Sequence, residues 1–252
     1  MSAGDRSADS AGQPWAGRHF ETTPFADDDG SAPERLIEAI RRFRSHEVRE
    51  AEVIDALRGT RLLVPMLAML GEAAPGPHGA LVDKSADLAI VTVATRDGRR
   101  VLPAFSSVGA MTAWNPKARP VPVEAERVAL AAASEGTDLV ILDPVSDTEF
   151  GLRRSMLESL ATGAAWRGCW SDPDVVGAFA SSGFGEDAVQ SVELLPGDPD
   201  ARLQSPELRV RLTLAPGLDR AGLDAVLARL GQRWAADPVI AARVDSLAVS
   251  VE

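Results

Sequence analysis

The chain is poor in the residues that build metal centres and covalent cross-links, because it has one cysteine and three histidines among 252 residues. A lone Cys169 can form neither an intramolecular disulfide nor a thiolate cluster for zinc. The longest hydrophobic run, residues 62–70, is about half a membrane span, and the first residues lack the basic and apolar pattern of a secretory leader. These features predict a cytoplasmic protein with no metal, no other cofactor and no membrane contact.

Positive charge is also scarce, and the formal net charge is −11. A surface that follows a phosphate backbone needs clustered lysine and arginine side chains. The one short basic stretch, residues 41–44, lies in a segment that also contains many acidic residues, and we interpret it as the solvated face of a helix. We therefore expect no nucleic-acid partner.

The hydrophobic content of 45% is sufficient for a globular core without cross-links. Residues 1–30 are rich in small and polar side chains and have no periodic apolar face, so they predict a disordered tail. Ser31 and Glu34 then form a capping-box pattern, with Pro33 in the first turn of a helix. A second helix is expected to stop at Gly59, because glycine is the usual left-handed residue after a helix.

Three strands are expected next, at residues 61–70, 86–95 and 99–107. Asp97-Gly98 between the last two is typical of a β-hairpin turn. Pro65 and Pro103 lack an amide donor, which predicts that both lie at strand ends or sheet edges.

Helical and strand patterns then alternate as far as residue 162, which favours an α/β (α+β) class with a mixed sheet and packed helices in a domain at 31–162. The expected elements are helices at 107–114, 124–135 and 152–162 and strands at 120–124 and 138–144. Residues 163–187 are rich in glycine and serine and predict a linker with a short helix. Residues 188–252 predict a small C-terminal ββαβ unit.

Ser106 and Ser107 stand at a turn between an apolar strand and a short helix, where hydrolases often place a nucleophile. Residue 105 is phenylalanine, which breaks one side of the Gly-x-Ser-x-Gly pattern. The histidines that could act as a base, His19, His46 and His78, fall in segments expected to be tail or loop. The sequence therefore predicts a helix-capping hydroxyl at Ser106 or Ser107, with no catalytic, cofactor-binding or metal-binding residues.

Trp114 and the terminal strand are further structural or contact candidates. Trp114 is expected to seat the helix at 107–114 on the sheet. The terminal strand carries Leu247, Val249 and Val251 at alternate positions, and nothing follows it to cover its outer side, so it is a candidate contact edge. The alternative is a strand in the middle of its own sheet, with both sides occupied.

Three features of this sequence, the motif at 62–65 (LLVP), the motif at 102–107 (LPAFSS) and Trp114 seven residues after Ser107, resemble the SseB-type N-terminal domain of the enhanced-serine-sensitivity family. The resemblance covers about residues 35–150 and is closest to the form found in high-GC bacteria. The C-terminal unit resembles the usual companion of that domain. The resemblance implies a fold and a cytoplasmic protein, with no catalytic residues to carry over.

The sequence favours a non-enzymatic interaction or regulatory protein that acts through contact with a protein partner. It also leaves open whether the chain forms a homo-oligomer. One alternative is the sensing of a small ligand between the two units, because domain junctions favour pockets. Another is an unrecognised hydrolase with Ser107 as its nucleophile.

Overall fold

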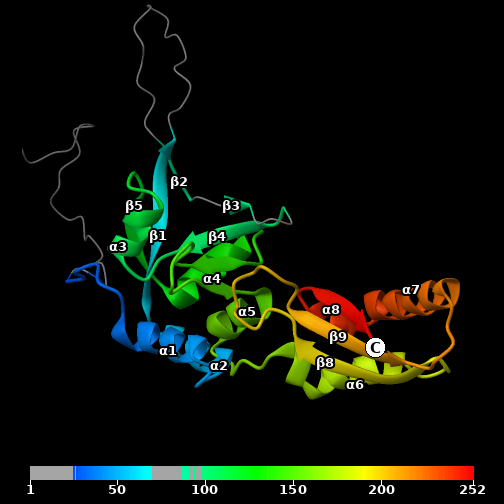
Figure 1. The fold of residues 1–252 in the computed structure, drawn as a ribbon. Coiled ribbons are helices and arrows are strands. Elements are labelled where there is room, and N and C mark those ends of the chain that lie inside the picture. Colours follow the sequence, from blue (N-terminus) through cyan, green and yellow to red (C-terminus); the bar gives the residue numbers. More distant parts are fainter. Residues whose placement is uncertain (1–24, 26, 70–86, 91–92, 95–97, 135) are drawn as a thin grey trace, which may run out of the picture.

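The computed structural model describes residues 25, 27–69, 87–90, 93–94, 98–134 and 136–252 (Figure 1). Its helices are α1 (Glu34–Arg44), α2 (Glu50–Leu57), α3 (Val108–Trp114), α4 (Ala125–Ser134), α5 (Arg154–Thr162), α6 (Pro173–Ser182), α7 (Arg220–Ala236) and α8 (Pro238–Arg243), with a 3-10 turn η1 (Cys169–Ser171). Its strands are β1 (Arg61–Met69), β2 (Asp87–Ile90), β3 (Val93–Ala94), β4 (Arg100–Ala104), β5 (Arg119–Glu124), β6 (Val140–Leu142), β7 (Phe150–Leu152), β8 (Val189–Pro196), β9 (Leu208–Leu214) and β10 (Leu247–Val251).

The strands form three small sheets, and the expected α/β class is confirmed. The first has the order β2-β1-β5 and is antiparallel. The second has the order β3-β4-β6-β7, with a parallel β4–β6 pair between antiparallel neighbours, so it is mixed. The third has the order β10-β9-β8 and belongs to the C-terminal ββαβ unit.

Two prolines explain why the first two sheets separate. Leu63 in β1 and Phe105 after β4 exchange both backbone hydrogen bonds, at 2.8 and 2.9 Å. The next hydrogen-bonded pair of this antiparallel ladder would place Pro65 opposite Pro103, and neither residue has an N–H to donate. The ladder therefore stops after one bridge, and β1 continues with β2 while β4 continues with β3.

The expectation for the prolines needs one correction. Pro103 lies one residue before the end of β4, but Pro65 lies in the middle of the central strand of its sheet. A central strand accepts Pro65 because the missing donor falls at the point where β1 changes its neighbour.

Two other expectations about element ends are wrong. α1 begins at Glu34 with Pro33 as the N-cap and no side-chain cap, so Ser31 and Glu34 form no capping box. Ser31 instead donates its backbone N–H to Asp29 and accepts Arg61 at its carbonyl. The helix expected at 152–162 starts at Arg154, because residues 150–152 form the short strand β7 against β6.

The N-terminal domain has one large hydrophobic core, to which α1, α2, α4 and α5 contribute buried faces against β1, β4, β6 and β7. Phe43 of α1 packs edge-on against Phe150 of β7, with ring centroids 5.4 Å apart. The end of the segment expected as a tail contacts this domain, since Asp28 accepts a bond from the buried Arg61 at 2.7 Å. The rest of residues 1–30, apart from residues 25, 27, 29 and 30, lies outside the described residues.

The C-terminal unit has a second core, in which α6, α7 and α8 pack on one face of the β8–β10 sheet. The expected alternation in β9 is confirmed, because Leu208, Val210 and Leu212 are buried whereas Arg209 is exposed. The segment 163–187 supplies η1 and α6 to this core. Phe179 of α6 is fully buried, and its ring centroid lies 5.3 Å from that of Trp234 in α7.

A buried arginine connects the two parts of the molecule. Arg153, at the joint between β7 and α5, donates to the carboxylates of Asp198 and Asp245 at 2.7 and 2.8 Å and to the carbonyl of Ser205 at 2.7 Å. All three partners belong to the C-terminal unit. In Figure 1 the chain that joins β8 and β9 reaches back beside α5, and its Ala201 carbonyl accepts the Gly151 amide.

Candidate functional site

Ser106 lies at the end of the parallel β4–β6 pair, where its partner is a carboxylate. Its backbone N–H and its hydroxyl donate to the two oxygens of Asp143 at 2.7 and 2.6 Å, and Thr148 adds a third bond at 2.8 Å. Ser106 and Asp143 are both buried. The bonds join residues that are 37 positions apart in the chain and fix the loop after β6 to the end of β4.

Ser107 is the N-cap of α3 and accepts the Ala110 amide at 3.1 Å. Trp114, at the other end of α3, is half-buried, and its ring centroid lies 5.3 Å from that of Phe105. Met111 and Leu63 complete this small cluster. The two serines therefore have different roles: Ser107 caps α3, and Ser106 donates hydrogen bonds to Asp143.

No histidine is among the hydrogen-bond partners of either serine in the part of the chain that the structure describes. His46 is exposed between α1 and α2, and His19 and His78 lie outside the described residues. Ser107, the nucleophile of the hydrolase alternative, is thus brought together with a helix amide rather than with a base.

The roles of Ser107 and Trp114 predict an order of stability losses. Trp114→Ala should lower the free energy of unfolding by about 3 kcal/mol, because it removes a large ring from the Phe105 cluster. Ser107→Ala should cost about 1 kcal/mol, the usual value of one capping bond. Denaturant melts measure both values, with Trp114→Phe as an intermediate control. A larger loss for Ser107→Ala than for Trp114→Ala would contradict the assignment.

A buried acidic residue lies next to the only cysteine at the junction of the two parts. Glu207 is 3% exposed, and one carboxylate oxygen accepts the Asp245 amide at 2.7 Å, while among the described residues the other has no nitrogen or oxygen partner and the Cys169 thiol is nearby. Burial raises the pKa of Glu207 above the ordinary glutamate value. Burial and, after it, the nearby Glu207 carboxylate also raise the pKa of the Cys169 thiol, which favours its protonated form.

Glu207 generates a pH-dependent prediction. A carboxyl whose pKa rises on folding binds its proton more tightly in the native chain, so native stability falls as the pH rises from the usual glutamate range toward the folded pKa. Glu207→Gln removes this loss. The free energy of unfolding of the variant should therefore rise relative to that of the unmodified chain between about pH 4.5 and about pH 8. Denaturant melts at both values test this. Glu193→Gln, at an exposed site, should show no such trend, and a constant difference for Glu207→Gln would contradict the prediction.

β10 occupies the edge of its sheet, because its only described strand neighbour is β9. Ser246 and Glu252 exchange hydrogen bonds with β9, through Leu208, Leu212 and Leu214. Because backbone groups alternate in direction along a strand, the residues of β10 at even positions point toward β9. The amides and carbonyls of Leu247, Val249 and Val251 therefore point away from the sheet.

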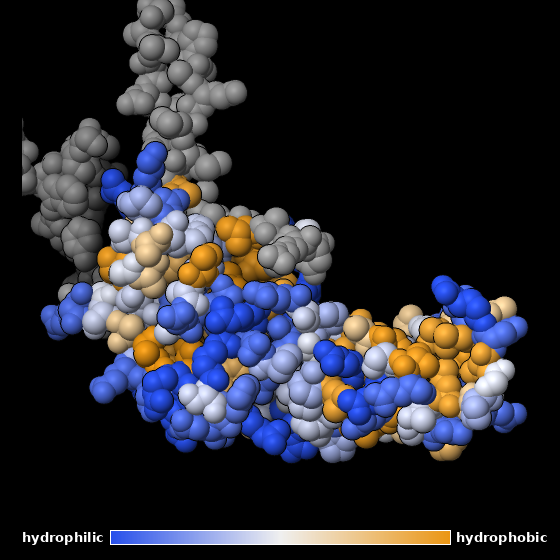
Figure 2. All heavy atoms as spheres, in the orientation of Figure 1, coloured by the Kyte–Doolittle hydropathy of each residue, from blue (hydrophilic) through white to orange (hydrophobic). Residues whose placement is uncertain are grey.

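The same three side chains face the helix layer, since Leu247, Val249 and Val251 lie beside the core residues of β9. Val249 is nevertheless 38% exposed and Val251 41% exposed, so the helices do not cover this end of the strand. An open apolar groove of about 310 Å³ adjoins it, lined mainly by Gly231, Trp234, Ala235, Ile240, Val244 and Leu247. Figure 2 shows hydrophobic residues gathered between α7 and the sheet at this end of the molecule.

Three of the other described sheet edges, those of β5, β7 and β8, carry features that block pairing. β5 has Pro120 and Pro122 opposite Pro65 and Leu63, and because the Leu63 backbone points toward Phe105, both β5 prolines present their nitrogens to the outer edge. β7 is covered where Gly151 bonds to Ala201. β8 has a register shift near Val189 and ends in Pro196. Within its described residues, β10 has no proline, bulge or charged side chain.

The fold and these surfaces define a two-part α/β protein, in which a mixed-sheet domain precedes a ββαβ unit. Residues 36–159 match the family model described as the SseB protein N-terminal domain, which confirms the resemblance of the sequence motifs to that domain. No curated protein and no solved structure matches the chain. Among the described helices, none combines the length and the apolar character needed to cross a membrane.

Proposed function

We propose that this chain is a non-enzymatic, cytoplasmic interaction module that binds an extended segment of a partner protein along β10. The observation that carries the proposal is an unprotected edge with three outward-pointing backbone positions, Leu247, Val249 and Val251. A segment that adds to such an edge gains main-chain hydrogen bonds, while its alternate side chains enter adjacent pockets. The single cysteine, Cys169, is free, which is compatible with a reducing compartment.

The chemistry of the edge specifies the kind of partner segment. An added strand would place every second side chain on the same face as Val249 and Val251, beside the apolar groove under α7. β10 itself has the uncharged sequence Leu-Ala-Val-Ser-Val. We therefore propose an uncharged partner strand that alternates β-branched apolar residues with small polar ones.

The test uses two proline substitutions that the strand register distinguishes. Val249→Pro removes an outward-pointing donor and should leave the melting temperature close to that of the unmodified chain. Ser250→Pro removes a donor that bonds to β9 and should destabilise the chain by about 1–3 kcal/mol, because it leaves a buried acceptor unpaired. The control Val249→Thr retains the outward N–H.

Binding is then measured by titration of the full chain with a blocked peptide of alternating valine and threonine. We expect Val249→Pro to weaken binding at least about tenfold and Val249→Thr to retain it, since one ladder donor is lost only in the first variant. A peptide methylated on its edge-facing amides should not bind. Equal affinity of the unmodified chain and Val249→Pro would overturn the proposal. Concentration-dependent dimerisation that Val249→Pro abolishes would show that the occupant is a second copy of the chain.

A further inference from the structure

A pocket of about 520 Å³ lies at the junction of the two parts, and its lining includes Ser246, the residue before β10. Its walls are the loop of residues 143–149, which follows β6, and the loop of residues 198–206, which joins β8 and β9. The apolar lining includes Val101, Ile141, Pro144, Val145, Leu203 and Pro206. The volume lies within the range of roughly 300–1,000 Å³ that small-molecule sites occupy.

Both walls contain residues in a backbone conformation that side chains disfavour. Val145 has φ +65° and Leu203 has φ +55°, and both line the pocket. Asp143 at φ +45° and Ala201 at φ +46° lie in the same two loops. A β-branched residue at positive φ is a strained position, and such positions collect at ligand sites. Four of the five described non-glycine residues with positive φ therefore belong to these two loops, and two of them line the pocket.

Specific contacts hold these strained residues in place. Val145 donates its amide to Glu149 at 2.7 Å, and Leu203 donates its amide to Asp198 at 2.9 Å. Leu203 also packs over Gly151, where an added Cβ would come within 2.4 Å of the leucine side chain. The pocket is thus preformed, and its apolar wall at Leu203 requires a glycine in β7.

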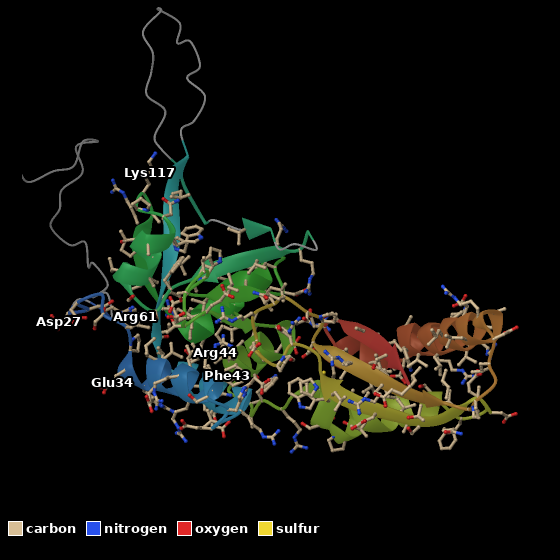
Figure 3. All side chains as sticks on the ribbon, in the orientation of Figure 1. Asp27, Glu34, Phe43, Arg44, Arg61 and Lys117 are labelled. Atoms are coloured by element: carbon tan, nitrogen blue, oxygen red, sulfur yellow. The ribbon has the colours of Figure 1, made fainter. Side chains whose placement is uncertain are left out.

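The charged lining of the pocket consists of Arg99, Glu149 and Arg202, and the side chain of Arg202 is 31% exposed. One of its nitrogens lies 3.4 Å from the Glu149 carboxylate, which is longer than the usual 2.7–2.9 Å of a charge-assisted bond. Burial and, after it, the neighbouring Arg202 lower the pKa of Arg44, whereas the carboxylates of Asp200, Glu149 and Asp198 act in the opposite direction, so charges of both signs meet behind this side of the pocket. Figure 3 shows Arg44 pointing from the end of α1 toward the middle of the molecule, where it bonds the carbonyls of Glu149 and Asp200.

We propose that this pocket binds a small organic carboxylate with an apolar body. The apolar body would lie against Val101, Ile141 and Leu203, and the carboxylate would accept bonds from Arg202 at the mouth. Glu149 retains its bond to the Val145 amide when Arg202 turns to the ligand, so the strained loop keeps its support. Guanidinium is suited to this role because its planar donors match a carboxylate.

The test titrates the full chain with hexanoate and phenylacetate, which differ in the shape of the apolar body. Acetate and hexanamide are the controls. Acetate has the carboxylate without a long apolar chain, and hexanamide has the apolar chain without the negative charge. We expect a saturable rise in melting temperature with at least one of the two larger acids and none with acetate or hexanamide. The absence of a rise with both acids, or an equal rise with hexanamide, would overturn the proposal.

Two variants locate the site. Arg202→Gln should weaken acid binding at least about tenfold, since it removes the proposed charge-assisted bonds, whereas Arg209→Gln, at an exposed position of β9, should leave binding unchanged. Val145→Gly should raise the melting temperature, because glycine adopts φ +65° without strain, and should change binding much less than Arg202→Gln, because the valine side chain is 90% exposed. Unchanged affinity in Arg202→Gln would overturn the assignment. The β10 proposal does not depend on this result, because the two surfaces share none of the residues tested.

Discussion

The buried guanidinium of Arg153 is the interaction on which the relation between the two parts of the molecule depends. Its side chain is 3% exposed, and the carboxylates of Asp198 and Asp245 that it contacts are 7% and 9% exposed. A charge buried to this extent requires hydrogen-bonded partners, and removing one partner leaves the others unpaired. Burial opposes the ionisation of Asp245, but Arg99 and Arg153 outweigh it and lower the pKa of this carboxyl. The lowered pKa of Asp245 therefore favours its ionised form, which pairs with Arg153 and Arg99.

The position of both proposed binding surfaces follows from this cluster. Asp198 opens the loop that forms one wall of the junction pocket, and Asp245 precedes β10 by two residues. Arg153 thus fixes a pocket wall and the start of the edge strand from a single point in the N-terminal domain. Glu207 also holds the start of β10, because it accepts the Asp245 amide. Burial raises the pKa of this carboxyl.

Local signals in the sequence were sufficient for most of the fold. The alternation in β9 and the hydroxyl at Ser107 each depend on neighbouring residues, and both features appear in the structure. The motifs at 62–65 and 102–107 indicated the SseB N-terminal domain that the family model matches. β7 was missed because a strand of three residues has no periodicity to detect, and Pro65 was misplaced because its acceptability depends on Pro103 in another strand.

The candidate sites could not be predicted in the same way. Asp143 reaches Ser106 across 37 positions, and Arg153 reaches Asp198 and Asp245 across 45 and 92 positions. A single charged residue gives no periodic signal, so only the folded chain shows which carboxylate it meets. The strained residues Val145 and Leu203 also have no sequence signature, because side chains of their kind are unfavourable at positive φ. Asp-Pro at 143–144 and at 198–199 is a local sign of a turn, but it does not indicate that either carboxylate is buried.

The most direct test of the role of Arg153 is the hydrogen exchange of individual amides in Arg153→Met and the unmodified chain. The Leu203 amide bonds to the Asp198 carboxylate, and the Asp245 amide bonds to Glu207. We expect both amides to lose protection in Arg153→Met, while amides inside β6 exchange only through global unfolding. The exposed Arg167→Met serves as the control. Unchanged protection of Leu203 and Asp245 in Arg153→Met would contradict the claim that this arginine positions the loop and the start of β10.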